Sequence, residues 1–100
     1  MVKHIVLWNF VDTLTKEERD NAYLKMKELL VPIKDLVPGA VEIQVVKNEL
    51  ESSNKDVALI STFETEEALK AYQVHPAHVE AGKFVCSVTC DRACLDYVVM

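Results

Sequence analysis

The chain has 100 residues, with 11 Lys and Arg against 16 Asp and Glu, so its formal net charge is −5 at pH 7. The length fits one domain, 1–100, and half of the residues are apolar, which excludes a disordered chain. The acidic balance argues against nucleic acid or membrane partners, because binding phosphates requires a basic surface. The sequence shows neither an apolar run near the roughly 20 residues of a membrane helix nor a signal peptide. We therefore expect a cytoplasmic globular protein.

Residues 2–11 are rich in β-branched, aromatic and other apolar side chains and predict a first strand. Thr15, followed three residues later by Glu18, forms the T-x-x-E pattern that marks a helix N-terminus. Apolar residues then recur at helical spacing, so we expect a helix over about 15–36. Pro32 lacks a backbone N–H and should kink this helix or end it early.

Residues 40–48 alternate between apolar and polar side chains, which is typical of a half-buried strand. A polar loop follows, and residues 56–64 predict a third strand. Thr65 is placed to cap a short helix from Glu66 to about Val74, and acidic residues in its first turn favour that helix.

His75 precedes Pro76 and should end this helix, because a residue before proline avoids the helical region. Pro76 can itself start a further helical segment through 77–88, and residues 92–99 predict a last strand. The element order is β-α-β-β-α-β. It indicates an α+β, ferredoxin-like fold, in which both helices cover one face of an antiparallel sheet.

Both faces of this sheet are apolar, although two helices can cover only one of them. One face of the first strand carries His4, Val6, Trp8 and Phe10, and the other carries Ile5, Leu7 and Val11. The third strand repeats the pattern, and an antiparallel sheet with a solvated face should instead alternate apolar and polar residues. We therefore expect a homodimer in which a second sheet covers the bare face.

The cysteines, Cys86, Cys90 and Cys94, are odd in number and do not suit a disulfide framework, which favours a reducing compartment. Their spacing matches no zinc ribbon or iron–sulfur motif, so we expect small buried apolar side chains. A metal site built from the three histidines has no H-E-x-x-H pattern to support it. No glycine-rich phosphate loop is present, and we expect neither a metal nor an organic cofactor.

Several segments together resemble the stress-responsive A/B barrel domain (Dabb) family of the dimeric α+β barrel superfamily. These are Met1–Leu7 (MVKHIVL), Ser61–Glu64 (STFE), Ala68–Val79 with its Y-x-x-H-P-x-H block, and the last strand with Asp91-Arg92 and Leu95-Asp96-Tyr97. The resemblance covers essentially the whole chain. It implies the same β-α-β-β-α-β fold, with two subunits packed sheet against sheet into a barrel.

The resemblance also implies candidate catalytic residues. One plant cyclase of the family closes a polyketide ring by an aldol condensation without metal or organic cofactor. Its acid/base residues match Tyr72 and His78 here, and a first-strand histidine that lines its pocket matches His4. The third-strand histidine of that cyclase is replaced here by Val57. Asp96, in the last strand, is expected from the family arrangement to orient His78.

Tyrosine and histidine suit proton transfer at a carbonyl compound. Histidine titrates near pH 6.5 and can exchange a proton at neutral pH, and a tyrosine hydroxyl can stabilise a developing enolate. We take Tyr72 and His78 as catalytic candidates. The expected substrate-binding residues, in a cleft between sheet and helices, are His4, Val6, Trp8, Tyr23, Leu59, Val79 and Asp96.

Structural explanations remain open for the same residues. His78 could be a helix-end histidine bonded to a backbone carbonyl, His4 a satisfied histidine under the helices, and His75 a capping or exposed residue. The function expected first is a homodimer that binds a small apolar or aromatic molecule. The alternatives are a cofactor-free enzyme of the aldol-type cyclase or lyase class, an oxygenase-like enzyme by analogy of fold, and a purely structural role in assembly.

Overall fold

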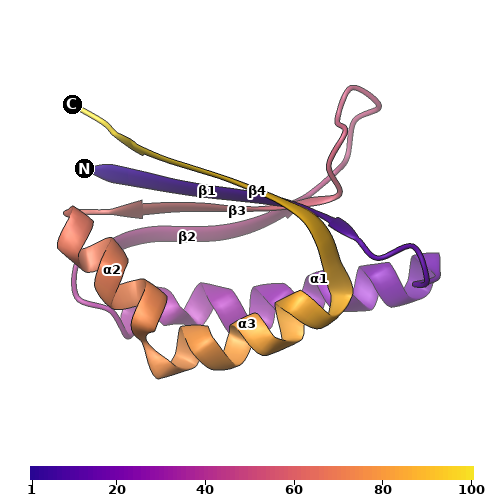
Figure 1. Cartoon of the computed structure of the whole chain (residues 1–100), viewed down its shortest axis with the longest axis horizontal. Helices are drawn as coiled ribbons and strands as arrows, with labels where there is room; N and C mark the ends of the chain where they lie inside the picture. The colour runs from indigo at the N-terminus through magenta and orange to yellow at the C-terminus, as the bar shows by residue number, and fades with distance from the viewer.

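The computed structural model describes all 100 residues, and its elements are arranged as two layers, a sheet and a set of helices (Figure 1). The strands are β1 (Val2–Phe10), β2 (Ala40–Lys47), β3 (Val57–Phe63) and β4 (Thr89–Val98). They form one antiparallel sheet in the order β2-β3-β1-β4. The helices are α1 (Lys16–Leu30), the 3-10 helix η1 (Val31–Asp35), α2 (Glu66–Val74) and α3 (Pro76–Val88). The predicted ferredoxin-like α+β fold is confirmed.

The predicted start and end of the first helix are also confirmed. The Glu18 amide donates to Thr15 Oγ1 over 3.1 Å, and the Thr15 amide donates to Glu18 Oε1 over 2.9 Å. The hydrogen bond that the Thr15 amide donates to the carboxylate, together with the Thr15 hydroxyl, holds the pKa of the Glu18 carboxyl below its ordinary value. At the other end α1 stops at Leu30 and continues as η1, whose second residue is Pro32.

His75 separates α2 from α3 and caps the second of these helices. Its backbone is extended (φ −62°, ψ 136°), and its Nδ1 accepts a hydrogen bond from the Ala77 amide over 3.1 Å. Pro76 follows as the first residue of α3, where its missing N–H costs nothing. The capping explanation of His75 is therefore correct. This junction turns the chain so that residues on α2 and α3 meet at one place.

The helix-facing side of the sheet holds the core. His4, Val6, Trp8 and Phe10 of β1 are all buried on this side, as the alternation predicted. Tyr72 and Phe63 are fully buried beside them, with ring centroids 5.1 Å apart. Burial of each large apolar side chain contributes roughly 1.5–3 kcal/mol, so these rings hold α2 against the sheet.

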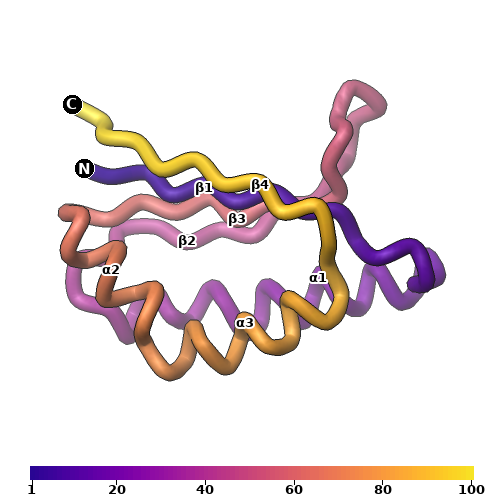
Figure 2. The backbone as a smooth tube through the Cα atoms, in the orientation of Figure 1, coloured from indigo at the N-terminus to yellow at the C-terminus, as the bar shows by residue number.

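The opposite side of the sheet carries no helix, as the backbone trace shows (Figure 2). In an antiparallel sheet directly paired residues point to the same side. Ile5, which alternates with the buried His4, is paired with Ile60 and Leu95, and Leu7 is paired with Ala58 and Ala93. We call this surface the open face and define it by the residues Ile5, Leu7, Ala58, Ile60, Ala93, Leu95 and Tyr97. These residues are apolar, as predicted, and Leu95 is 61% exposed in the single chain. Lys3, Thr62, Glu42 and Gln44 lie on the same side of the sheet around them.

Candidate functional site

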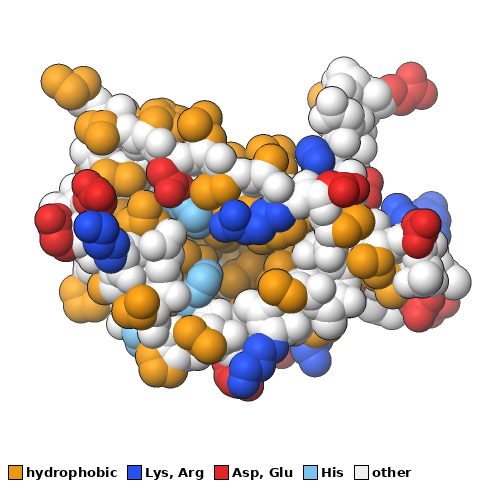
Figure 3. Space-filling model, in the orientation of Figure 1, with side chains coloured by type: hydrophobic (Ala, Val, Ile, Leu, Met, Phe, Trp, Pro, Cys, Tyr) orange, Lys and Arg blue, Asp and Glu red, His pale blue; other side chains and the backbone are white.

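A cavity of about 150 Å³ lies between the sheet and the helices. Its eleven lining residues come from β1, β3, β4 and all three α-helices, and seven of the eleven are hydrophobic. The space-filling view shows the corresponding hollow on the side of the molecule where β4 and α3 lie (Figure 3). Histidine side chains stand in its wall, and a Lys or Arg side chain lies at its rim. A cavity with mostly apolar walls and a few polar groups is typical of a small-molecule site.

Tyr72 lies at the centre of this cavity wall. Its side chain is fully buried, and its hydroxyl is one of two buried side-chain polar atoms without a hydrogen-bond partner. Burial raises the pKa of the phenol far above its ordinary value, because the charged phenolate would be poorly solvated. Tyr72 is therefore a neutral hydrogen-bond donor at physiological pH, with its donor unused.

His78 lies directly beside Tyr72, with ring centroids 4.4 Å apart. Its Nδ1 is 3.1 Å from the carbonyl oxygen of Gln73. A carbonyl oxygen only accepts, so Nδ1 carries the proton, and in the neutral ring Nε2 keeps a free lone pair. His78 thus hydrogen-bonds a backbone carbonyl and also lines the cavity, and the two explanations offered by the sequence hold together.

Burial lowers the pKa of His78 below its ordinary value. The hydrogen bond to Gln73 acts in the opposite direction, while the charges of His4 and Arg92 lower the pKa further. The imidazole is consequently neutral near pH 7 and can accept a proton at Nε2. A neutral base beside a protonated phenol is the combination that proton transfer at a carbonyl compound requires.

Asp96 does not orient His78, contrary to the expectation from the family arrangement. Its carboxylate accepts a hydrogen bond from His4 Nδ1, with 2.5 Å between Nδ1 and Oδ1. The cause is the pairing of β1 with β4, which sets Asp96 directly opposite His4, whereas His78 lies on α3. His4 in turn presents its ring edge-on to Tyr72, with centroids 6.1 Å apart. Asp96 therefore acts on the cavity only through His4.

Four of the seven expected substrate-binding residues line the cavity with Tyr72 and His78, namely His4, Val6, Trp8 and Leu59. The other three, Tyr23, Val79 and Asp96, do not. Val79 is 50% exposed, because it follows His78 on α3 and points about 100° further around the helix. Tyr23 faces β2, where its hydroxyl donates to the Val45 carbonyl oxygen over 3.3 Å.

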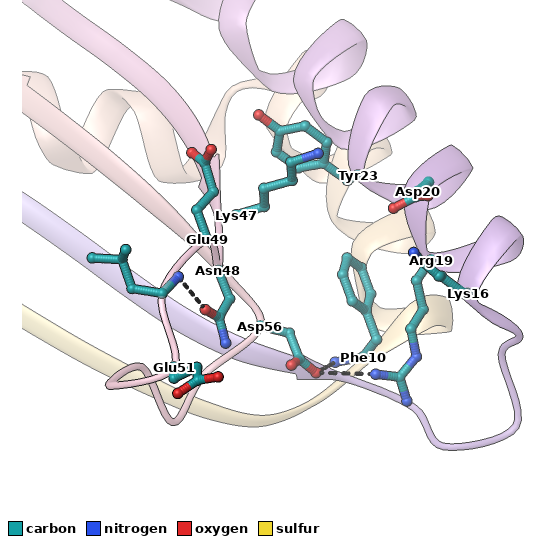
Figure 4. Close-up of a pocket in the computed structure, with 11 residues that line it drawn as sticks. Phe10, Lys16, Arg19, Asp20, Tyr23, Lys47, Asn48, Glu49, Glu51 and Asp56 are labelled. Carbon is teal, nitrogen blue, oxygen red and sulfur yellow. Dashed lines mark hydrogen bonds and ion pairs between the residues drawn. The ribbon is translucent and has the colours of Figure 1, made fainter.

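Tyr23 instead borders a separate surface groove of about 440 Å³ between α1 and the β2–β3 loop (Figure 4). The groove has side chains of both charges, and its best-defined interactions join structural elements. Asp56 Oδ2 accepts a hydrogen bond from the Phe10 amide over 2.9 Å and lies 3.7 Å from Arg19. Asp56 therefore fixes the start of β3 against β1 and α1 from the wall of this groove.

The sequence analysis missed Gly82, Cys86 and Arg92, which also line the cavity. Gly82 and Cys86 lie four and eight residues after His78, so helical periodicity could have placed them on the same face. Arg92 lies four residues before Asp96 on β4, so strand alternation could have placed it on the same side of the sheet as that residue. The side chain of Arg92 is exposed at the cavity rim.

The expectation that the cysteines are buried is wrong for Cys86 and Cys94, which are exposed. Cys86 faces the cavity, and Cys94 lies on the edge strand β4, which has a neighbour on one side only. All three thiols are free. Cys94 Sγ lies 3.8 Å from His4 Nδ1 and 3.6 Å from Asp96 Oδ1, a set that has the atom types of a metal site. The direct hydrogen bond between His4 and Asp96 already accounts for this arrangement.

The lowered pKa of His78 predicts a pH-dependent stability. In the unfolded chain His78 returns to a pKa near 6.5, so between that value and the lower folded pKa the unfolded state binds more protons. The contribution of His78 is therefore lost as the pH falls through about 6.5. We expect the difference in free energy of unfolding between wild type and His78→Gln to be smaller or reversed at pH 5 compared with pH 7.5, in urea titrations. A difference that does not change with pH would contradict this.

The fold and the cavity together define a ferredoxin-like α+β protein with a histidine and tyrosine site between sheet and helices. Residues 2–99 match the model of the Stress responsive A/B Barrel Domain (Dabb). The chain belongs to this family. None of its helices has the length and hydropathy needed to cross a membrane.

Similar proteins include both a named enzyme and uncharacterised dimers. The chain is 34% identical over 84 residues to olivetolic acid cyclase of Cannabis sativa, a match that covers 81% of this chain and 79% of the cyclase. It resembles a dimeric protein of unknown function from Bacteroides fragilis NCTC 9343 (TM-score 0.90, 33% identity, 98% and 95% of the two chains). A dimeric ferredoxin-like protein from Thermobifida fusca matches with a TM-score of 0.81 at 23% identity, over 98% and 90% of the chains, and shows the fold.

Proposed function

We propose that this protein binds a small aromatic or apolar carbonyl compound in the cavity and moves a proton at the carbon next to the carbonyl, without a cofactor. One observation carries the proposal. The buried, unpartnered hydroxyl of Tyr72 lies against the neutral ring of His78 at the wall of an otherwise apolar cavity. An unsatisfied buried hydroxyl costs about 1–3 kcal/mol, and a ligand oxygen would satisfy it.

The two residues have distinct roles. His78 Nε2 takes the proton from the carbon, and the electron pair of that C–H bond moves onto the carbonyl oxygen to form an enolate. The Tyr72 hydroxyl donates a hydrogen bond to that oxygen as its charge develops. The surrounding apolar side chains, with Trp8 and Leu59 among them, exclude water and strengthen this interaction.

The size of the cavity limits the ligand. A cavity of roughly 150 Å³ accommodates a benzene ring, so the ligand part held inside is about one ring. The similarity to olivetolic acid cyclase supports an enzymatic use of the cavity. Val57 stands where the resemblance implies a third-strand histidine in that cyclase, so the two reactions are expected to differ.

Deuterium exchange into the methyl group of acetophenone tests the proposal, because the compound has one ring and an acidic C–H beside its carbonyl. We expect the protein to accelerate the exchange in D₂O, followed by NMR. Gly82 lines the cavity, and a Cβ added there meets no atom within 4 Å. Gly82→Leu should therefore fill the cavity and abolish the acceleration, while the helix gains about 1 kcal/mol from the loss of glycine.

Gly82→Ala is the matched control for this experiment. It gives the same gain in helix propensity with a single methyl group, so it should be stabilised and retain most of the exchange activity. If Gly82→Leu is folded and as active as the wild type, the reaction does not take place in this cavity.

We also propose that the protein is a cytoplasmic homodimer joined through the open face. The dimeric proteins that it resembles support this, and so does the exposure of large apolar side chains such as Leu95 and Tyr97 on a sheet without a covering layer. The three free thiols fit a reducing compartment.

A further inference from the structure

We propose that Arg92 binds a carboxylate of the ligand, so that the substrate class is a one-ring organic acid whose ring enters the cavity while its carboxylate remains at the rim. The inference rests on the proposed function, because it concerns the same cavity. It adds a specificity-determining residue to the site. It also assigns a negative charge to the ligand, which the proposed function describes only as aromatic or apolar.

Strand alternation in β4, which contains a bulge just before Arg92, places Arg92 at the cavity. Cys90 is paired with Asn9 and Ala93 with Leu7, so three residues of β4 span the distance that two residues of β1 span. Asp96 and Cys94 are paired with the buried His4 and Val6, so regular alternation puts Arg92 on the helix side of the sheet, next to Ala93 on the open face, and the bulge changes the alternation only for the residues before it. Asp91 takes up the irregularity with a φ of 54°, a left-handed conformation that aspartate tolerates better than most residues.

The positive charge of Arg92 has no carboxylate partner. The ion pairs of the structure involve other side chains, and the nearby Asp96 is held by His4. Arg19, which is the other arginine of the chain, does have a partner in Asp56. An unpaired guanidinium at the rim of an apolar cavity is notable in a protein with a net charge of −5.

The shape of the guanidinium selects the anion. Its planar fork of N–H donors matches the two oxygens of a carboxylate, and such charge-assisted pairs are roughly twice as strong as neutral hydrogen bonds. A carboxylate attached to a ring keeps the charge at the rim while the ring enters the apolar interior. Arg92 would thereby orient the ligand toward Tyr72 and His78.

Benzoate and benzamide are a matched pair of probes, equal in size and shape but different in charge. We expect the wild type to bind benzoate at least about 10-fold more tightly than benzamide, as measured by calorimetry. Arg92→Gln should remove that preference and leave benzamide binding unchanged. Arg19→Gln removes the same charge at a distant site and should keep the preference, and Arg92→Lys should retain only part of it because the fork is lost.

A second readout comes from the three histidines, which NMR can follow individually. Benzoate bound at Arg92 should raise the pKa of His78 in the wild type, because its negative charge offsets the positive charge of Arg92, which lowers that pKa. In Arg92→Gln, benzoate should not raise the pKa of His78. If both probes bind equally well to wild type and Arg92→Gln, the inference is wrong while the cavity remains a binding site. If neither probe binds and acetophenone exchange is not accelerated, the proposed function fails and the inference with it.

Discussion

His78→Gln is expected to lower the rate of acetophenone exchange by about 10²–10⁴-fold, the range that a positioned general base contributes. Glutamine can still donate a hydrogen bond to the Gln73 carbonyl oxygen and has a similar volume, so the wall of the cavity is preserved. It has no basic nitrogen, and the proton from the ligand then has no acceptor. The measurement is the exchange rate per folded protein, with folding checked by circular dichroism.

Tyr72→Phe is the variant that distinguishes a functional site from a structural one. It removes the hydroxyl that has no partner and keeps the ring that packs on Phe63 and His78. We expect the protein to become more stable by about 1 kcal/mol, because an unsatisfied buried group is lost. The exchange rate should fall about 10²-fold or more, because the enolate loses its donor.

A substitution that raises stability and lowers activity is characteristic of a residue that is retained for function at a cost in stability. If Tyr72→Phe and His78→Gln both keep the exchange rate within twofold of wild type, neither residue takes part in the reaction. The exchange would then depend on other groups and the proposed mechanism would be wrong, while the benzoate experiment would still test binding in the cavity.

The parts of the fold that could be predicted from sequence are those set by local interactions. Thr15 with Glu18 and Thr65 with Ala68 form caps within three residues, and Pro32 acts on its own helix. The alternation in β1 likewise predicted which side chains face the helices. Each of these signals involves neighbours in the chain, so one sequence suffices to detect it.

The parts of the site that could not be predicted depend on pairing between distant segments. Whether Asp96 meets His4 or His78 is decided by the register of β4 on β1, over 92 positions in sequence. Arg92 lies on the same side of β4 as Cys94 and Asp96 by alternation, and that this side meets the cavity is decided by the pairing of β4 with β1. Tyr72 and His78 were predicted through the family resemblance rather than from periodicity.

Leu7→Lys is expected to dissociate the proposed dimer. Leu7 lies in the middle of the open face between Ala58 and Ala93, and a two-fold interface contains it twice. Each copy loses roughly 1.5–3 kcal/mol of apolar burial and also places an unpaired charge against apolar side chains. The dissociation constant should therefore rise at least about 10²-fold, as measured by analytical ultracentrifugation over a range of concentrations.

Leu24→Lys is the matched control, because Leu24 is 59% exposed on α1, away from the open face. It should leave the oligomeric state unchanged. A Leu7→Lys variant that remains a stable dimer would show that the subunits join through another surface. Since the cavity lies on the helix side of the sheet, a folded Leu7→Lys monomer should still bind benzoate, which would separate the assembly of the protein from the chemistry of its site.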